Sequence, residues 1–590
     1  MAESRLFFRA RETGRPPTLR NATDMTTIRT LLLDAARQHP GETFVRWKAD
    51  RQWHSWTFAD LFDRARRVSE ALAKLGVRGG DRVALMMENR PEWMSTYLGI
   101  VSVGVTCVPV DARLHAHEVS HIMRDSEAVA LFGSGKVGPL VQEIMGTMKF
   151  LRSVVLLDGA IAETRREGGV RLYDYDGLLE SVAGAAAAAG ACFDNHEALE
   201  GDVASIIYTS GTTGRSKGAM LTHGNFCSQL EALKCFTVHR DDNFLLVLPL
   251  HHAFAFTANF VVPLACQCEI SIVENLRTIP ENMKETQPTI LLAVPLLAEK
   301  MLGAIMKKLH KSTAARALMA LGLSRVVGKK VVAQLGGRLR IIICGGAASD
   351  PDVLRQWTKF GVKTLQGYGL TETAPICALA PEDAIRFESV GKALPGHELR
   401  IAEPNDEGVG EIEVRGPSVM KGYFRNEDAT KECFDGEGWF RTGDLGTMDG
   451  DGYVTITGRK KSLIVNREGK NIYPEEVELV INACPHVLES IVLGYHVPGE
   501  KKGEHVGAIV VADLDKIAED RNKGDASSAS PLSDDQIRKL CVDEIHAAMK
   551  ELSTYKHPRR IQVRFDPLQK TNTLKVKRYL YSLDGGADPA

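Results

Sequence analysis

The stretch Tyr208-Thr-Ser-Gly-Thr-Thr-Gly-Arg-Ser-Lys-Gly218 decides how this chain is interpreted, and it directly follows an apolar, strand-like segment at residues 203–207. Glycines let the backbone turn tightly and direct several N–H groups inward. The hydroxyls add further donors, and Lys217 adds a positive charge. A loop of this composition after a buried strand is suited to binding a polyphosphate.

The loop differs from the common P-loop, G-x-x-x-x-G-K-[ST]. Ser216 stands where the second Gly is required, and Gly218 where the Ser or Thr is required. The alternative is a flexible Gly/Ser/Thr linker. We favour the phosphate loop, because a linker has no reason to follow a buried strand or to end in Lys-Gly before the apolar residues 219–221.

The composition indicates a globular protein of two to four domains, because 590 residues are too many for one core. Hydrophobic residues make up 44% and charged residues 25%, which is ordinary for such proteins. A net charge of −2, with Lys and Arg spread along the chain, argues against a nucleic-acid partner. The 11 scattered Cys favour reduced thiols in the cytoplasm, and early Glu3 and Arg5 argue against a secretory signal.

Residues 243–268 contain no Asp, Glu, Lys or Arg and are long enough to cross a bilayer. They also contain two Pro, two His, two Asn and one Gln, which are costly in lipid. We therefore predict a buried strand, a turn and a buried helix. A wall of an apolar pocket is compatible with the same burial.

Strand-like and helical patterns alternate through the first three-quarters of the chain, which predicts an α/β fold with largely parallel sheets. Apolar strands run into Gly turns at 341–347 and 363–369, where a nucleotide would lie at the carboxyl ends of parallel strands. Short strands with Gly turns at 410–416 and 452–458 indicate a small β subdomain. Residues 519–535, rich in Ser and Asp, are predicted to be a disordered loop.

Four further motifs follow residues 208–217 in order: Tyr368-Gly-Leu-Thr-Glu-Thr373, Arg441-Thr-Gly-Asp-Leu-Gly446, Gly458-Arg-Lys-Lys461 and Thr573-Leu-Lys-Val-Lys-Arg578. Together the five resemble the adenylate-forming superfamily of acyl-CoA synthetases, peptide-synthetase adenylation domains and luciferases. One such motif would be weak support, whereas five in the same order are specific.

The resemblance implies an α/β fold with a large N-terminal domain of βα-layered subdomains plus a small β subdomain, and a mobile smaller α+β C-terminal domain. The expected boundaries are 1–458 for the N-terminal AMP-binding domain, 459–461 for a hinge around Lys461, and 462–590 for the C-terminal domain. The C-terminal domain would rotate between two half-reactions, and a hinge of this kind is a few residues that absorb a large φ/ψ change.

The resemblance also implies the reaction. A carboxylate attacks the α-phosphate of ATP and releases pyrophosphate, and a thiol then attacks the acyl-adenylate and releases AMP. The cofactors would be ATP, Mg²⁺ and CoA, with a small-molecule carboxylic acid as substrate. The amino-acid sequences of residues 366–375 and 469–474 are most similar to those of medium- and long-chain fatty acyl-CoA synthetases.

The motifs assign roles to particular positions. Glu372 and Thr209 would bind Mg²⁺, Asp444 and Arg459 the ribose, and Tyr368 one face of the adenine. Without the resemblance, Glu372 would pass for a helix-start carboxylate, Asp444 for a turn cap and Arg459 for a surface charge. The resemblance assigns the following set to ATP: Thr209, Ser210, Gly211, Thr212, Thr213, Gly214, Lys217, Gly345, Gly346, Ala347, Gly367, Tyr368, Gly369, Thr371, Asp444, Arg459 and Lys575.

Lys575 matches the catalytic lysine that bridges the attacking carboxylate and the α-phosphate, although a surface lysine is the plain alternative. Here the chain departs from the family pattern. Leu574 replaces the usual Gly before that lysine, and Gln569 replaces a usual Pro. Leu574 would stiffen the loop, whereas its register is kept, because Lys570, Thr571, Thr573 and Arg578 still fit the pattern.

The acyl pocket would be bordered by Leu248-Pro-Leu-His-His-Ala-Phe254, in which His252 takes the family's catalytic His position. Phe254 and Phe256 would line the same wall, with core packing as the competing explanation. No Asp lies in this stretch to pair with an amino group, so an acid without a charged tail is favoured.

Three alternatives stay open: a fatty acyl-AMP ligase that loads a carrier-protein thiol, a luciferase-like oxidoreductase, and a catalytically silent scaffold. An aryl-acid or other acid–CoA ligase is a variant of the preferred function. Residues 4–11 fit either a peripheral membrane contact or ordinary N-terminal packing. The expected location is the cytoplasm, and the sequence indicates no oligomeric state.

Overall fold

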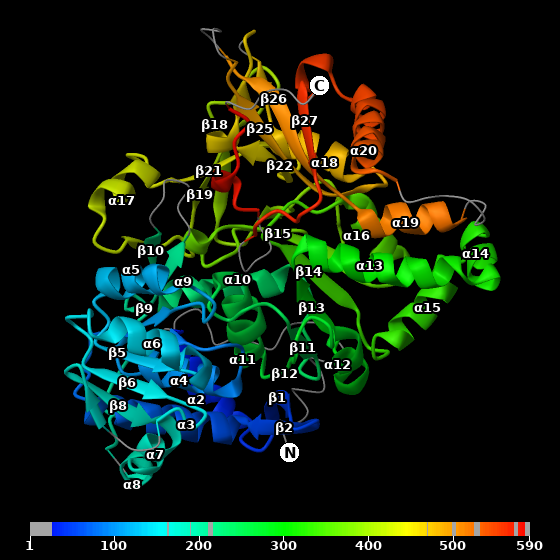
Figure 1. Cartoon of the computed structure of the whole chain (residues 1–590). Coiled ribbons are helices and arrows are strands. Elements are labelled where there is room, and N and C mark those ends of the chain that lie inside the picture. The colour runs from blue at the N-terminus through cyan, green and yellow to red at the C-terminus, as the bar shows by residue number, and fades with distance from the viewer. Residues whose placement is uncertain are drawn as a thin grey trace. The chain divides into compact units, whose positions relative to one another are not determined.

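The computed structural model describes residues 26–161, 165–188, 190–209, 216–468, 470–497, 503–523, 532–570 and 576–584. The chain forms two compact units, whose elements are labelled in Figure 1. Unit 1 comprises Met1–Leu399 and Val414–Phe440, and unit 2 comprises Arg400–Glu413 and Arg441–Ala590. The small β subdomain therefore groups largely with the C-terminal part. A hinge at 459–461 stays a prediction, because this grouping does not report which segment turns.

Unit 1 contains two nine-stranded sheets. Sheet A has the order β17-β16-β15-β14-β13-β11-β12-β1-β2, and the six strands from β15 to β1 in this order are parallel to one another. Its strands are β1 (Thr43–Ala49), β2 (Gln52–Thr57), β11 (Asn243–Leu246), β12 (Glu269–Ile272), β13 (Ile290–Ala293), β14 (Ile341–Gly345), β15 (Lys363–Tyr368), β16 (Ala378–Leu379) and β17 (Lys392–Ala393).

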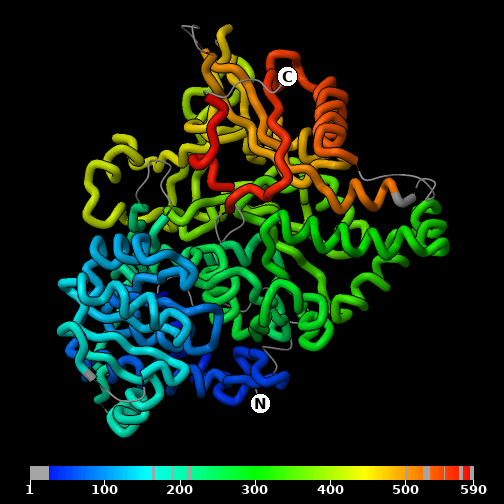
Figure 2. The backbone as a smooth tube through the Cα atoms, viewed as in Figure 1, coloured from blue at the N-terminus to red at the C-terminus, as the bar shows by residue number. Residues whose placement is uncertain are grey.

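Sheet B has the order β20-β10-β9-β4-β3-β5-β6-β8-β7, with a parallel centre and antiparallel edges. Its strands are β3 (Arg82–Met86), β4 (Thr106–Pro109), β5 (Ala130–Gly133), β6 (Ser153–Leu156), β7 (Arg165–Glu167), β8 (Val170–Asp174), β9 (Val203–Thr209), β10 (Lys217–Thr222) and β20 (Gly422–Tyr423). The blue and cyan segments of Figure 2 supply most of sheet B, and the green segments most of sheet A.

Helices cover the sheets, which explains why the central strands are apolar at every position. All four residues of β4, β5, β6, β11 and β13 are buried, as expected for parallel strands covered on both faces. The helices of unit 1 are α2 (Ile28–Gln38), α3 (Phe58–Lys74), α4 (Pro91–Val101), α5 (Ala116–Ser126), α6 (Gly138–Met145), α7 (Tyr175–Glu180), α8 (Ala183–Ala187), α9 (His223–Ser228), α10 (Ala253–Phe256), α11 (Val262–Cys266), α12 (Ile279–Thr286), α13 (Pro295–His310), α14 (Thr313–Ala320), α15 (Ser324–Gln334), α16 (Pro351–Lys359) and α17 (Glu427–Cys433).

The uncharged segment 243–268 forms buried strand β11, a turn, and a helical stretch in which a π-helical turn joins α10 to α11. This confirms the predicted strand, turn and helix. Among the described residues, no helix is both long and apolar enough to cross a bilayer. All 11 cysteines are free thiols.

Unit 2 combines a four-stranded sheet with a three-stranded sheet, and three strands of the four-stranded sheet cross the boundaries of the unit's residue ranges. The strands are β18 (Glu398–Ala402), β19 (Gly410–Arg415), β21 (Phe440–Met448), β22 (Val454–Arg459), β23 (Ile464–Val465), β24 (Asn471–Ile472), β25 (Val487–Tyr495), β26 (His505–Ala512) and β27 (Arg560–Arg564). All eight residues of β26 are buried, and helices α18 (Pro474–Asn482), α19 (Leu514–Lys523) and α20 (Asp534–Ala548) complete the unit.

The predicted disordered loop at 519–535 is wrong at both ends. Residues 519–523 continue α19, and 534–535 begin α20. The side chain of Ser533 accepts a hydrogen bond from the Gln536 amide and so caps α20, a signal that a Ser-rich composition conceals. The middle of the predicted loop, 524–531, lies outside the described residues.

Candidate active site

The predicted phosphate loop connects two adjacent antiparallel strands. Thr209 ends β9 and lies opposite Lys217, the first residue of β10. The intervening residues, which include Ser210, Gly211, Thr212, Thr213 and Gly214, lie outside the described residues. The structure thus brings Thr209 and Lys217 together at the base of the loop, and their Oγ1 and carbonyl oxygen are 3.5 Å apart.

Helix α5 holds the base of this loop from both sides. The Tyr208 hydroxyl donates to Asp125 at 2.5 Å, and His121 Nε2 lies 3.0 Å from the Ser216 carbonyl oxygen. Burial and the hydrogen bond to Asp125 both raise the pKa of Tyr208, so its hydroxyl stays protonated and remains a donor. Helix α5 therefore contacts both chain segments from which the loop extends.

Glu372 lies in a 3₁₀ turn that follows β15, with 8% of its surface exposed. Its Oε1 accepts a hydrogen bond from the Tyr423 hydroxyl at 2.8 Å, while Lys217 Nζ lies 5.2 Å from the centroid of the Tyr423 ring. Tyr423 is on β20, directly beside β10, so it links the cation at the loop base to the carboxylate. Burial and the neighbouring Glu372 raise the pKa of Tyr423, which keeps it a neutral donor.

The backbone around Glu372 is fixed by partners from distant segments. Gln229 Nε2 donates to the Ile376 carbonyl at 2.9 Å, and Gln229 Oε1 accepts from the Ile376 amide at 3.0 Å. The Met420 amide donates to the Glu372 carbonyl at 2.8 Å. These bonds hold the turn through its backbone, so its position does not depend on the Glu372 side chain.

The predicted adenine-binding residues gather at the carboxyl ends of β14 and β15, where Gly345 lies opposite Gly367. A Cβ on Gly369 would lie 1.9 Å from the Pro375 carbonyl oxygen, so only glycine fits there. Gly346 has a φ of +87°, the left-handed region that glycine adopts freely. This edge of sheet A carries Gly345, Gly346, Ala347, Gly367, Tyr368, Gly369 and Thr371.

Two side chains from sheet B hold the loop that carries His252. Asn89, which follows β3, donates to the Leu248 carbonyl and accepts from the Leu250 amide, both at 2.9 Å. Asp111, which follows β4, has its Oδ2 3.2 Å from His251 Nε2, and both side chains are 9% exposed. The His251 ring in turn lies 4.3 Å from that of His252.

Burial alone would raise the pKa of Asp111, but the hydrogen bond and charge of His251 lower it, and the net shift is downward. The pair is therefore a close, buried contact between the two sheets of unit 1. Sequence analysis missed Asn89, Asp111 and Tyr423. Asn89 and Asp111 come just after strand-like segments, and this position at the carboxyl end of a strand could have identified them. Tyr423 lies on β20, which is too short to produce a recognisable pattern.

The two predicted acyl-pocket phenylalanines differ in environment. Phe254 is half-buried against Gly345, where an added Cβ would lie 3.2 Å from its ring. Phe256 is 2% exposed, with its ring centroid 4.5 Å from that of Tyr97 and 4.7 Å from that of Phe226. This packing favours the core explanation for Phe256 and leaves Phe254 as the better candidate for contact with substrate.

In unit 2 the predicted ribose pair is adjacent across two strands. Asp444 on β21 lies opposite Arg459 on β22, and Arg459 Nε is 2.8 Å from Asp444 Oδ1. Asp444 is 5% exposed, whereas the Arg459 side chain is 46% exposed. Predicted hinge residue Lys461 follows in a 3₁₀ turn, Lys460–Ser462.

The C-terminal motif is described only at its edges. Lys570 pairs with Val576 in a short bridge and forms an ion pair with Glu489. Arg578 donates to both carboxylate oxygens of Glu478 at 2.6 Å, which ties the motif to α18. Thr571, Thr573, Leu574 and Lys575 lie outside the described residues, as do Gly469 and residues 4–11.

Comparison with known proteins assigns the family. Residues 32–424 match the family described as AMP-binding enzyme, so the chain belongs to it. The chain is 29% identical to a long-chain-fatty-acid–CoA ligase, FadD15, of Mycobacterium bovis, over 93% of this chain and 94% of the relative. It is 30% identical to a 2-succinylbenzoate–CoA ligase of Bacillus licheniformis, over 89% and 94%.

Among solved structures, the anthranilate–CoA ligase AuaEII in complex with anthranoyl-AMP has the same fold, with a TM-score of 0.75, 22% identity, and coverage of 94% of this chain and 96% of that one. The adenylate-forming superfamily and the α/β fold predicted from the sequence are thus confirmed. The protein is an acid–CoA ligase that works through an acyl-adenylate.

Proposed function

We propose that the protein activates a medium- or long-chain fatty acid with ATP and transfers the acyl group to CoA, releasing pyrophosphate and AMP. The arrangement that carries this proposal is Lys217, Tyr423 and Glu372 on adjoining segments at the base of the phosphate loop. It places a cation, a neutral hydroxyl and a buried carboxylate within reach of one polyphosphate. Positioning and charge neutralisation of this kind are the main requirements of phosphoryl chemistry.

Glu372 fits a Mg²⁺ ligand that acts together with the nucleotide. The described residues contain no group of three or more His, Cys, Asp or Glu suited to holding a metal alone. Mg²⁺ in nucleotide sites characteristically uses one or two carboxylates plus phosphate oxygens and waters. When bound, the ion would neutralise phosphate charge, while Thr209 and Lys217 orient the phosphates and Asp444 accepts hydrogen bonds from the ribose.

The acid is proposed to lack a charged tail, because the loop beside the predicted pocket is uncharged and Phe254 is partly exposed there. Asp111, the nearby carboxylate that could attract an amino group, is paired with His251. One relative is named as a ligase of long-chain fatty acids and another as a ligase of 2-succinylbenzoate, an aromatic acid. Fatty acids and aromatic acids are therefore the two substrate classes to compare. The sequences of residues 366–375 and 469–474 resemble those of fatty acyl-CoA synthetases and therefore favour a fatty acid.

The test is pyrophosphate release with acids from acetate to oleate and with aromatic acids, each with and without CoA. We expect the highest kcat/KM for a medium- or long-chain fatty acid. An acyl-CoA product should form only when CoA is present. A Glu372→Gln variant controls for contaminating ligases. Preference for an aromatic acid would overturn the fatty-acid assignment, and acyl transfer to a carrier protein but not to CoA would overturn the acceptor.

A further inference from the structure

A long segment of unit 1 has only one sign of charge. Residues 300–349 contain no Asp or Glu, and the neighbouring acids in the sequence are Glu299 and Asp350. Their Lys and Arg residues are Lys300, Lys307, Lys308, Lys311, Arg316, Arg325, Lys329, Lys330, Arg338 and Arg340. Such a concentration of cations in a protein of net charge −2 indicates a local anionic partner.

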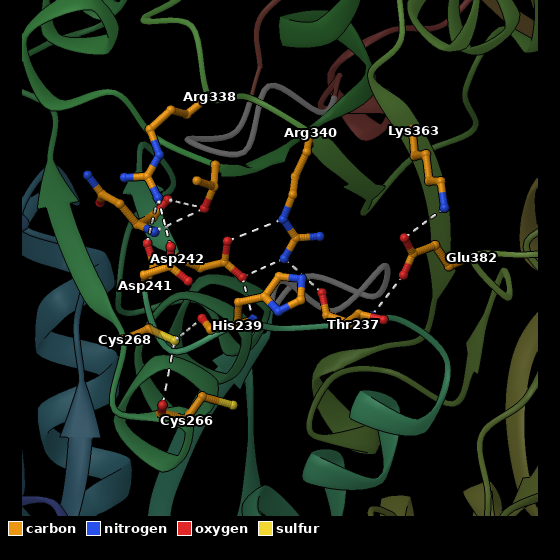
Figure 3. Close-up of polar contacts among 12 residues, drawn as sticks. Thr237, His239, Asp241, Asp242, Cys266, Cys268, Arg338, Arg340, Lys363 and Glu382 are labelled. Carbon is orange, nitrogen blue, oxygen red and sulfur yellow. Dashed lines mark hydrogen bonds and ion pairs between the residues drawn. The ribbon is translucent and has the colours of Figure 1, made fainter. Parts of the chain in front are cut away.

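Two of these cations belong to the body of the unit. Arg340 forms an ion pair with Asp242, and Arg338 lies 3.3 Å from Asp241, at the start of the parallel strands (Figure 3). Arg340 also donates to the Thr237 carbonyl at 2.8 Å. The remaining eight lie on or between α13, α14 and α15, and all eight are exposed.

The α14–α15 connection presents apolar side chains among these cations. Leu321 is 74% exposed, the highest value among the large apolar residues that the structure describes. Leu323 and Val326 are 45% and 46% exposed. Arg325, Lys329 and Lys330 are exposed beside them, and Val326, Lys329 and Lys330 share one helical face through i, i+3 and i+4 spacing.

The opposite face of α15 anchors this connection to unit 1. Val327 and Val331 are buried in the core that contains β13 and β14, and a Cβ on Gly328 would lie 2.1 Å from the Phe360 carbonyl oxygen. Helix α14 buries none of its residues and lies at the outer end of α13 and α15 (Figure 1). The apolar tip is thus held outward by a rigid base rather than by a loose loop.

We propose that the tip of α14–α15, defined by Leu321, Leu323 and Val326 with Arg316, Arg325, Lys329 and Lys330, docks on the surface of an anionic lipid bilayer. The apolar side chains enter the interface between headgroups and acyl chains, while the long cationic side chains reach the headgroups. Cations spread over three helices match the laterally continuous charge of a bilayer. Exposed apolar residues among long cationic side chains are the pattern of a segment that lies in a membrane interface, which is why a lipid bilayer is the partner proposed.

The experiment is co-sedimentation of the full chain with vesicles of phosphatidylcholine alone or with about 30% phosphatidylglycerol, at low and at physiological salt. We expect binding to the anionic vesicles only, weakened by salt because the contact is at the surface. The variant Lys329→Gln/Lys330→Gln should bind roughly 10- to 30-fold more weakly. The variant Leu321→Ser/Leu323→Ser should lose at least about tenfold at either salt concentration, because apolar insertion is not screened.

The matched control is Leu276→Ser/Arg277→Gln, which removes an exposed leucine, 61% accessible, and its neighbouring cation from another surface of unit 1. This control should bind vesicles like the unmodified chain, and all variants should keep pyrophosphate release with a water-soluble acid, which reports correct folding. Absence of binding to anionic vesicles at low salt, equal loss in the control, or binding to an acidic carrier protein without vesicle binding would each overturn the proposal.

Discussion

Units 1 and 2 each contain a buried carboxylate that is predicted to bind part of the nucleotide, and the two carboxylates have different partners. Glu372 in unit 1 is 8% exposed and receives a hydrogen bond from the neutral Tyr423 hydroxyl. Asp444 in unit 2 is 5% exposed and is paired with the half-exposed cation Arg459. A neutral donor leaves the charge of Glu372 available to a cation, whereas an ion pair neutralises Asp444 and suits it to an uncharged sugar. The two carboxylates are buried to a similar degree, so their predicted roles differ because of their bonding partners.

The largest effect is expected at Lys575, the predicted catalytic lysine. Lys575→Ala should lower adenylation about 1000-fold, because removing a positioned charge donor costs about 3–4 kcal/mol in the transition state. Thioester formation from preformed acyl-adenylate should be nearly unchanged. Single-turnover assays of the two half-reactions measure this split, with Lys577→Ala as the neighbouring control. Equal losses in both halves would contradict the assignment.

Glu372→Gln tests the unit 1 side of the comparison. Pyrophosphate release should fall about 100-fold, with a shift to higher Mg²⁺ requirement, because the amide keeps the shape and loses the charge. Tyr423→Phe is the control: it keeps the carboxylate, removes the hydroxyl that orients it, and should cost only about fivefold. An unchanged Mg²⁺ dependence in Glu372→Gln would exclude Glu372 as a ligand.

Asp444→Asn tests the unit 2 side. The KM for ATP should rise about 10- to 50-fold with little change in kcat, because a charged acceptor for hydroxyls is replaced by a neutral one. The comparison with 2′-deoxy-ATP and 3′-deoxy-ATP sharpens this result. The unmodified chain should discriminate against both analogues, and the variant should not. Full discrimination in the variant would show that Asp444 does not contact the ribose.

A buried histidine should also make unit 1 sensitive to acid. Burial lowers the pKa of His223 to about 4, and its Nδ1 accepts from the Ile28 amide. Because the unfolded chain binds a proton near pH 6.5 and the folded chain does not, stability is full above that pH and falls as pH drops toward 4. The loss should be about 2 kcal/mol at pH 5.

Urea unfolding of the unmodified chain and of His223→Gln at pH 7.5 and pH 5 measures this contribution. The variant should be less stable at pH 7.5 and should lose less stability on acidification. His546→Gln removes an exposed histidine of unit 2 and serves as the control. An identical pH dependence in His223→Gln and the unmodified chain would refute the role of His223.

The smallest effect is expected for the contact between the two sheets of unit 1. Asp111→Asn weakens the clamp on the loop that carries His252 and should raise the KM for the acid about three- to tenfold while sparing the KM for ATP. Asp125→Asn is the matched carboxylate at the phosphate loop, where it accepts from Tyr208, and should raise the KM for ATP instead. Equal effects of both variants on both substrates would indicate a general structural role.

Most of the fold was predictable because its signals are local. Apolar runs ending in Gly turns identified β14 and β15, and the uncharged segment 243–268 was correctly assigned to a buried strand and helix. Motif order identified the superfamily. The ends of the segment 519–535 were missed because Ser and Asp favour both disorder and helix caps, and only the capped geometry of Ser533 separates the two.

By itself the sequence determined the class of protein, the alternation of strands and helices, and which residues carry charge or conformational freedom at the predicted site, since these depend on a residue and its near neighbours. Only the tertiary structure decided the partners: Tyr423 for Glu372, Asp111 for His251, and Gln229 for the turn at 371–376. These pairs join residues 51 to 147 positions apart in the sequence. Their proximity depends on how whole sheets pack, which no local pattern contains.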